Sequence, residues 1–238
     1  MPASPPDFIA GLPGYGDDPQ KRGRMAARWH LLVGPVAADI AGRTVLDLAA
    51  HDGRWAYAFA QAGAAHVTAV EARPALLATF SDFPDDQIRS RVSCVADDVF
   101  AFLERVVAAG EQYDVVAVLG FLYHTMDHYR LFVLIRKLGP ALIIVDGEFI
   151  TSDNAIVQVL QERTEGALTA IAQFEGQQKT LVGVPSTGLM QRIAGVLDYD
   201  LHWADPETLP GDLRPFAGDY FRGGRKSRRA CYLVKPGG

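Results

Sequence analysis

Residues 45–55, VLDLAAHDGRW, decide the fold. The first half is apolar apart from Asp47, which predicts a strand buried on both faces of a sheet. The second half lies where many α/β proteins carry a glycine-rich turn before a helix, yet Gly53 is its single glycine. The stretch therefore predicts a strand, a turn and a helix, and a ligand site at the turn.

Strands and helices alternate from this stretch to residue 150. Continuously apolar runs such as VVAVL suit a sheet that helices cover on both sides. Five βα units in series predict an α/β fold with a doubly wound, mostly parallel sheet. The expected strands are 44–49, 66–72, 91–97, 113–120 and 141–150, and the expected helices are 53–63, 74–83, 98–110 and 127–139.

The flanking segments have other patterns. Residues 1–20 contain five prolines and predict an irregular arm, and helical spacing in 21–41 predicts two helices broken at Gly34-Pro35. Strands at 199–205 and 228–236 are expected to close a seven-stranded sheet with an antiparallel last strand. A helix is expected at 154–166, a hairpin between 167–174 and 179–185, and a helix at 186–198. The prediction is one domain, 1–238, with an arm and helices (1–41), a ligand-binding core (42–150) and a covering segment (151–238).

Composition narrows the function classes. The net charge of −5 gives no overall attraction to nucleic acid or anionic membranes, and the only dense basic run is RGGRKSRR at 222–229. No apolar stretch approaches the ~18 residues that a membrane span needs. Cys94 and Cys231 lie in apolar stretches and are expected to be buried free thiols, so we expect a cytoplasmic protein.

Acidic and polar residues follow each expected strand. In a doubly wound sheet, ligands bind outside the carboxyl ends of the strands. Glu71 ends the second strand about 20 residues past the first turn, where an acidic side chain accepts the hydroxyls of a ribose. Asp97 and Asp98 follow the third strand and suit an adenine amino group, although Asp98 also suits a helix cap.

The first turn argues against a dinucleotide. A pyrophosphate needs G-x-G-x-x-G to approach the backbone amides, and AAHDGRW lacks it. His51 and Asp52 put bulk and negative charge where the pyrophosphate would lie. The turn therefore favours a ligand with an uncharged or cationic middle, such as a nucleoside joined to a sulfonium amino acid.

These motifs together resemble those of class I S-adenosylmethionine-dependent methyltransferases. VLDLAAHDGRWAYAFAQAGAAHVTAVEARP resembles the first two motifs of that family, CVADDVF its adenine-side motif and YDVVAVLGFLYH its fourth-strand motif. The departure is the first turn, where Ala49-x-His51 replaces the usual G-x-G. The resemblance implies S-adenosylmethionine as cofactor, held by Asp47, Ala49, His51, Gly53, Trp55, Glu71, Ala72, Asp97, Asp98 and Leu119.

Methyl transfer to a hydroxyl also needs a base. His124 follows the fourth strand at the mouth of the expected cleft and is the predicted general base, whereas His128 is expected to be structural. Tyr123 and Asp127 are expected to line the acceptor site. Asp146 and Glu148, after the fifth strand, are expected to orient the acceptor or polarise His124. Holding a divalent cation is the less favoured role for them.

The sequence leaves several classes of methyl acceptor as alternatives. TLVGVPSTGLMQRIAGVLDYD resembles the region after the sheet in bacterial enzymes that methylate sugars and other secondary metabolites, so a small polyhydroxylated acceptor, a sugar or short saccharide, is favoured. LGFLYHTMDHYR also resembles tRNA wobble-uridine carboxymethyltransferases, although the acidic net charge disfavours nucleic acid. A third hypothesis is a cofactor-binding partner subunit without activity. A homodimer is compatible with all three.

Overall fold

The computed structural model describes residues 8–12, 15, 18–166 and 168–237. Its main sheet has seven strands in the order β3-β2-β1-β4-β5-β9-β8. Their bounds are β1 Thr44–Leu48, β2 His66–Glu71, β3 Val92–Ala96, β4 Val115–Leu119, β5 Leu142–Ile150, β8 Asp200–Trp203 and β9 Lys226–Val234. Strands β1 to β5 pair in parallel, and β9 runs antiparallel to both of its neighbours, β5 and β8. The predicted mostly parallel sheet with an antiparallel last strand is confirmed.

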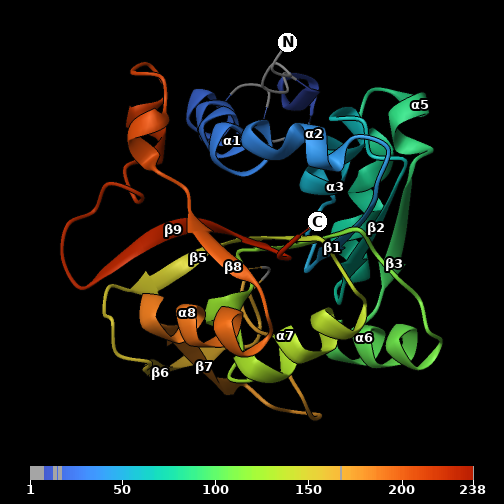
Figure 1. Cartoon of the computed structure of the whole chain (residues 1–238). Helices are drawn as coiled ribbons and strands as arrows, with labels where there is room; N and C mark the ends of the chain where they lie inside the picture. The colour runs from blue at the N-terminus through green and yellow to red at the C-terminus, as the bar shows by residue number, and fades with distance from the viewer. Residues whose placement is uncertain (1–7, 13–14, 16–17, 167, 238) are drawn as a thin grey trace.

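Helices cover both faces of this sheet (Figure 1). One face carries α1 (Pro19–Leu32), α2 (Ala37–Ile40) and α3 (Arg54–Gln61), and the other carries α6 (Val99–Ala108), α7 (His128–Lys137) and α8 (Thr187–Val196). Each face has its own apolar cluster. This two-sided burial explains why β4, VVAVL, is buried along its whole length.

Several local signals in the sequence act as expected. The Asp98 carboxylate caps α6 by accepting from the backbone N–H groups of Phe100 and Ala101, and Gly110 follows the helix with a φ of 73°. Segment 34–36 breaks the N-terminal helices at the predicted Gly34-Pro35. The predicted helix at 74–83 is a short α4 (Pro74–Leu77) followed by a 3-10 turn, Ala78–Asp82; α5 (Asp86–Arg89) then precedes β3.

Residues 154–166 were predicted to be helical, which is wrong. They contain β6 (Val157–Arg163), which pairs antiparallel with β7 (Lys179–Pro185) in a separate two-stranded sheet. The predicted hairpin partner, 167–174, forms no strand in its described residues, 168–174. The β-branched Val157 and Val159 favour an extended backbone, and most of β6 is exposed, so no buried helical face exists to outweigh that preference.

The predictions for the two cysteines and for the N-terminal arm can also be compared with the structure. Cys231 is buried as predicted, but Cys94 is exposed on β3, which is an edge strand of the sheet. The irregular arm expected at 1–20 includes residues 1–7, 13–14 and 16–17, which lie outside the described residues. Among the helices that are described, none has the length and apolar character to cross a membrane.

Candidate functional site

A cavity of about 1110 Å³ opens at the carboxyl ends of the parallel strands. That volume exceeds what one small ligand needs, so a nucleoside cofactor and a small acceptor fit together. The predicted site residues on its lining are Asp47, Ala49, His51, Trp55, Glu71, Ala72, Asp98, Leu119, Tyr123, His124 and Asp127. Gly53, Asp97, Asp146 and Glu148 are not on it.

The first turn has the shape of a glycine-rich turn without its glycines. Ala49 and His51, at the positions of the expected G-x-G, have φ angles of 56° and 55°, and Gly53 follows at 81°. A left-handed backbone costs roughly 1–2 kcal/mol for a residue with a Cβ atom. At Gly53 a Cβ would also lie 2.5 Å from the ring of Phe80, so glycine is required there for packing.

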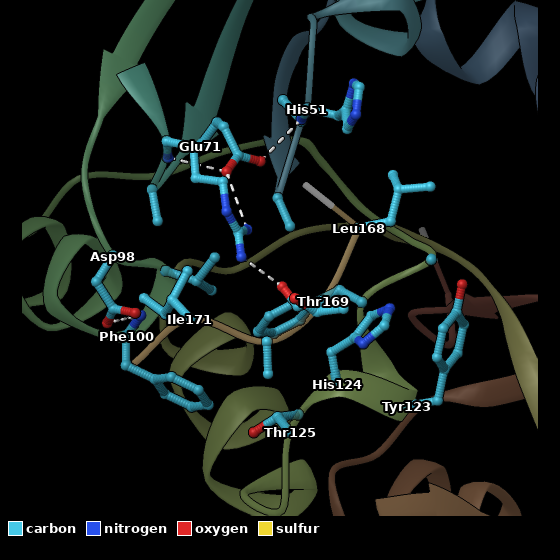
Figure 2. Close-up of a pocket in the computed structure, with 18 of the residues that line it drawn as sticks. His51, Glu71, Asp98, Phe100, Tyr123, His124, Thr125, Leu168, Thr169 and Ile171 are labelled. Carbon is cyan, nitrogen blue, oxygen red and sulfur yellow. Dashed lines mark hydrogen bonds and ion pairs between the residues drawn. The ribbon is translucent and has the colours of Figure 1, made fainter. Parts of the chain in front are cut away.

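Glu71 joins this turn to the end of β2. One oxygen of its carboxylate accepts from the backbone N–H of His51 at 3.0 Å, and the other accepts from that of Arg73 at 3.0 Å (Figure 2). A carboxylate has about four acceptor positions, so Glu71 retains capacity for the two hydroxyls of a ribose. The Glu71 side chain is only 7% exposed and lines the cavity, which suits a residue that binds a ribose there.

His51 and Asp52 shape the turn through their side chains. Asp52 accepts from Nε of Arg54 at 2.7 Å and from the hydroxyl of Tyr15 at 2.9 Å, and Arg54 also contacts Nδ1 of His51 at 3.0 Å. Burial opposes ionisation of Asp52, but the hydrogen bond from His51 and the charge of Arg54 outweigh it and hold the pKa of Asp52 below its usual range. Burial raises the pKa of Tyr15 to about 12.

Asp47 presents a buried, unsatisfied oxygen beside the turn. Its side chain lines the cavity, and Oδ2 has no hydrogen-bond partner among the residues that the structure describes. Burial raises the pKa of Asp47 to about 8. A buried polar atom without a partner is costly. The amino group of a bound aminoacyl nucleoside would satisfy this oxygen, so Asp47 fits the predicted cofactor.

Of the acidic pair that follows β3, only Asp98 lies on the cavity. Asp98 caps α6 as predicted and also lines the cavity, where its contact with an adenine stays a prediction. The Asp97 carboxylate instead accepts from the backbone N–H of Asp98 and from Arg105 at 2.5 Å. Figure 2 shows Asp98 and Phe100 together in the site.

His124 lies across the cavity from Glu71 and is bound by a residue that sequence reasoning did not identify. Its Nδ1 is 2.7 Å from Oε2 of Glu162, which also accepts from the backbone N–H of Ala170 at 2.8 Å. Figure 2 shows the loop with Thr169 and Ile171 passing between Glu71 and His124. In a neutral imidazole, a carboxylate at Nδ1 holds the proton on that nitrogen and leaves the lone pair on Nε2.

The neighbours of His124 divide into lining and structural residues. Tyr123 lines the cavity with its ring centroid 4.4 Å from that of His124. His128 is buried, and its Nε2 lies 2.9 Å from the carbonyl of Leu122 and 3.0 Å from that of Gly183. Burial lowers the pKa of His128, which favours the neutral ring. These contacts suit the structural role that the sequence predicted for it.

Neither Asp146 nor Glu148 lines the cavity, and each forms an ion pair with at least one basic side chain. Asp146 is fully buried and accepts from Arg28 at 2.5 Å, from Nε of Arg228 and from the hydroxyl of Tyr220 at 2.6 Å. Burial opposes its ionisation, but Arg228 and Arg28 outweigh it and hold the pKa of Asp146 below its usual range. Glu148 pairs with Lys226. Within the described chain, no cluster of three or more His, Cys, Asp or Glu is arranged to hold a metal ion.

The sequence analysis did not predict three parts of the site. They are Glu162, the loop 168–173, and the arginines Arg24, Arg28 and Arg228. Glu162 depends on β6, which was predicted as helix. The carbonyl of Thr169 accepts from Arg73 at 2.7 Å, a contact between residues 96 positions apart. The arginines had one available signal, since Arg228 lies in the basic run at 222–229.

Comparison with known proteins places this geometry in a structural class. No family model matches the chain, and no curated protein does. The N-terminal domain of EvdMO1, solved with S-adenosylhomocysteine (SAH) and D-fucose, aligns over 92% of this chain and 83% of its own, at 15% identity and a TM-score of 0.60. The glycopeptide N-methyltransferase MtfA aligns over 90% of both chains, at 16% identity and a TM-score of 0.54.

A third structure agrees with these two. An S-adenosylmethionine-dependent methyltransferase from Mesorhizobium loti aligns over 87% of this chain and 98% of its own, at 12% identity and a TM-score of 0.54. With identities of 12–16%, the three alignments show a likeness of fold and no more. The chain has the fold of the S-adenosylmethionine-dependent methyltransferases.

Proposed function

We propose that the chain is an S-adenosylmethionine-dependent methyltransferase that methylates a hydroxyl of a small polyhydroxylated acceptor, with a sugar as the favoured class. The observation that carries the proposal is that His124, paired with Glu162 at 2.7 Å, lines the same cavity as Glu71 and Asp47. The solved structure of a similar domain with SAH and D-fucose supports the same class of donor and acceptor.

Each end of the cavity has a defined task. Glu71 accepts the ribose hydroxyls, Asp98 and Phe100 flank the adenine, and Asp47 accepts from the amino group of the methionine part. When bound, the cofactor supplies a methyl group on a sulfonium, and the C–S electron pair stays on sulfur. His124 takes the hydroxyl proton on Nε2 as the new O–C bond forms, and Glu162 holds the ring and balances its new charge.

Asp146 enters the proposal as a positioning residue. It does not line the cavity, but it fixes Arg28 and Arg228, which do. The alternative of a tRNA substrate has less support in the structure. Of the basic run, Arg228 is buried and Lys226 is paired with Glu148, so the run does not form a continuous exposed cationic surface.

The test separates donor binding from turnover. Glu71→Ala is expected to weaken SAH binding at least tenfold by isothermal titration. His124→Ala and Glu162→Gln are expected to keep SAH affinity within twofold and to lower kcat more than tenfold in a methyl-donor assay across sugar and phenolic acceptors. Glu162→Asp should recover part of kcat without changing the acceptor KM. A protein that does not bind SAH, or a His124→Ala variant with full turnover, contradicts the proposal.

A further inference from the structure

Three arginines line the end of the cavity that lies beyond β4. Arg24 and Arg28 project from successive turns of α1, and Arg228 comes from β9. Arg24 makes two bonds to Asp219, at 3.0 and 2.6 Å, while Arg28 and Arg228 share Asp146. We call Arg24, Arg28 and Arg228 the arginine corner.

The carboxylates that hold the corner lie behind it. Neither Asp146 nor Asp219 lines the cavity, and Asp146 has no exposed surface. Within the described residues, the ion pairs of the corner join three guanidinium groups to two carboxylates, which leaves one positive charge in excess. The cationic side of these pairs is therefore the side that a ligand meets.

Arg28 has unused hydrogen-bonding capacity at this wall. Its Nε is buried and has no partner among the described residues, although its NH2 group contacts Asp146. Its guanidinium also stacks over Trp55, 4.9 Å from the ring centroid, which fixes the plane of the group. A buried donor without a partner costs free energy that an anionic ligand would recover, and a planar guanidinium matches carboxylate and phosphate.

The sheet order places the corner on the acceptor side. Glu71 on β2, Asp98 after β3 and Asp47 on β1 mark the donor half, and β4 lies between that half and β5 and β9. Arg228 reaches the end of β4, where its NH2 lies 3.7 Å and the Tyr123 hydroxyl 3.5 Å from the point that a Cβ on Gly120 would occupy. Arg228 therefore faces the space next to Tyr123 and His124 rather than the ribose, while Arg28 extends the corner toward Trp55 after the first turn.

We propose that the arginine corner binds an anionic group of the acceptor, a carboxylate or a phosphate ester, so that the acceptor is an acidic sugar rather than a neutral one. This inference rests on the proposed function and narrows its substrate class. Arg24 and Arg28 contact the anion directly, and Asp146 and Asp219 hold the guanidinium groups in place.

The test compares acidic and neutral probes on protein saturated with SAH. D-glucuronate and D-glucose 6-phosphate present the two anions, and D-glucose is the neutral counterpart. Isothermal titration is expected to show at least one acid binding tenfold or more tightly than glucose. Arg28→Gln and, separately, Arg24→Gln should reduce that preference to threefold or less. Arg24 is 38% exposed, so its variant folds even if loss of the buried Arg28 does not permit folding.

A control variant and three contrary results complete this test. Arg214→Gln removes an arginine that pairs with Glu207 outside the cavity and should leave the preference unchanged. Equal binding of acids and glucose, or a preference that survives both corner variants, overturns the inference while SAH binding leaves the proposed function standing. If Arg28→Gln weakens SAH but not 5′-methylthioadenosine, the anion is the donor's own carboxylate, and the inference is again overturned. Absence of SAH binding rejects the proposed function itself.

Discussion

Two residues of the first turn hold a backbone shape that glycine adopts at lower cost. Ala49 has a φ of 56°, whereas the neighbouring Ala50 is not in the left-handed region. We expect Ala49→Gly to raise the free energy of unfolding by about 1 kcal/mol, because relief of left-handed strain exceeds the entropy that glycine loses. Ala50→Gly should lower it by about 0.5–1 kcal/mol. Urea denaturation measures both, and a loss of stability in both variants would contradict the strain.

Asp47 gives the site a dependence on pH. Burial raises its pKa to about 8, so below that pH the free protein carries Asp47 mainly as the neutral acid. A cationic amino group favours the ionised form, and SAH affinity is therefore expected to rise between pH 6 and 8. Asp47→Asn should weaken SAH binding and remove this rise. Equal pH dependence in the variant would assign it to another group.

The same shift has a consequence for the protein without ligand. The folded-state pKa of about 8 lies above the ordinary carboxyl value, so the folded state binds the extra proton between the two values. The contribution of Asp47 to stability is full at low pH and is lost as the pH rises toward 8. Asp47→Asn should remove that part of the decline in melting temperature.

At the scale of elements, the sequence predicted the strands and helices that are marked by a local pattern, such as an apolar run or a capping residue. Strand β4 is apolar throughout because both of its faces are buried, and α6 begins at the cap that Asp98 supplies. Strand β6 has no such signal. Most of it is exposed, and its partner β7 begins 16 residues after its end, so the local preference of its β-branched residues becomes a strand only through pairing with β7. Glu162 lies on β6, and its contact with His124 could not be predicted while the strand was read as a helix.

The residues proposed to bind the cofactor were easier to predict from the sequence than those proposed to bind the acceptor. Glu71 lies 20 residues from His51, a spacing within one βα unit, and its hydrogen bond to that turn follows from the parallel pairing of β1 and β2. Arg28 and Asp146 are 118 residues apart, and Arg228 and Asp146 are 82 apart. Such pairs depend on the packing of α1 and β9 against β5, which no local pattern encodes.

At the scale of the whole molecule, Asp146 joins the N-terminal helix, the middle of the sheet and the C-terminal strand. It accepts from Arg28 on α1 and from Arg228 on β9 while itself lying on β5. Asp146→Asn is expected to lower the free energy of unfolding by about 3 kcal/mol or more, because it leaves buried cations unpaired. Glu148→Gln, two residues along the same strand, breaks a partly exposed pair and should cost under about 1 kcal/mol.

The pH dependence of this effect has the opposite sign to that of Asp47. The folded-state pKa of Asp146 is lowered, so its contribution is present above the ordinary carboxyl pKa and is lost as the pH falls toward the folded value. Urea denaturation at pH 7 and pH 3 measures the difference. The gap between wild type and Asp146→Asn should narrow in acid, and a gap that widens would contradict the ion-pair assignment.

The non-glycine turn also bears on how distant relatives of this chain are recognised. Ala49 and His51 adopt positive φ angles at positions where glycine is the usual residue. A search for glycines at these positions would therefore pass over this turn, whereas a search of structures by its φ angles would find it.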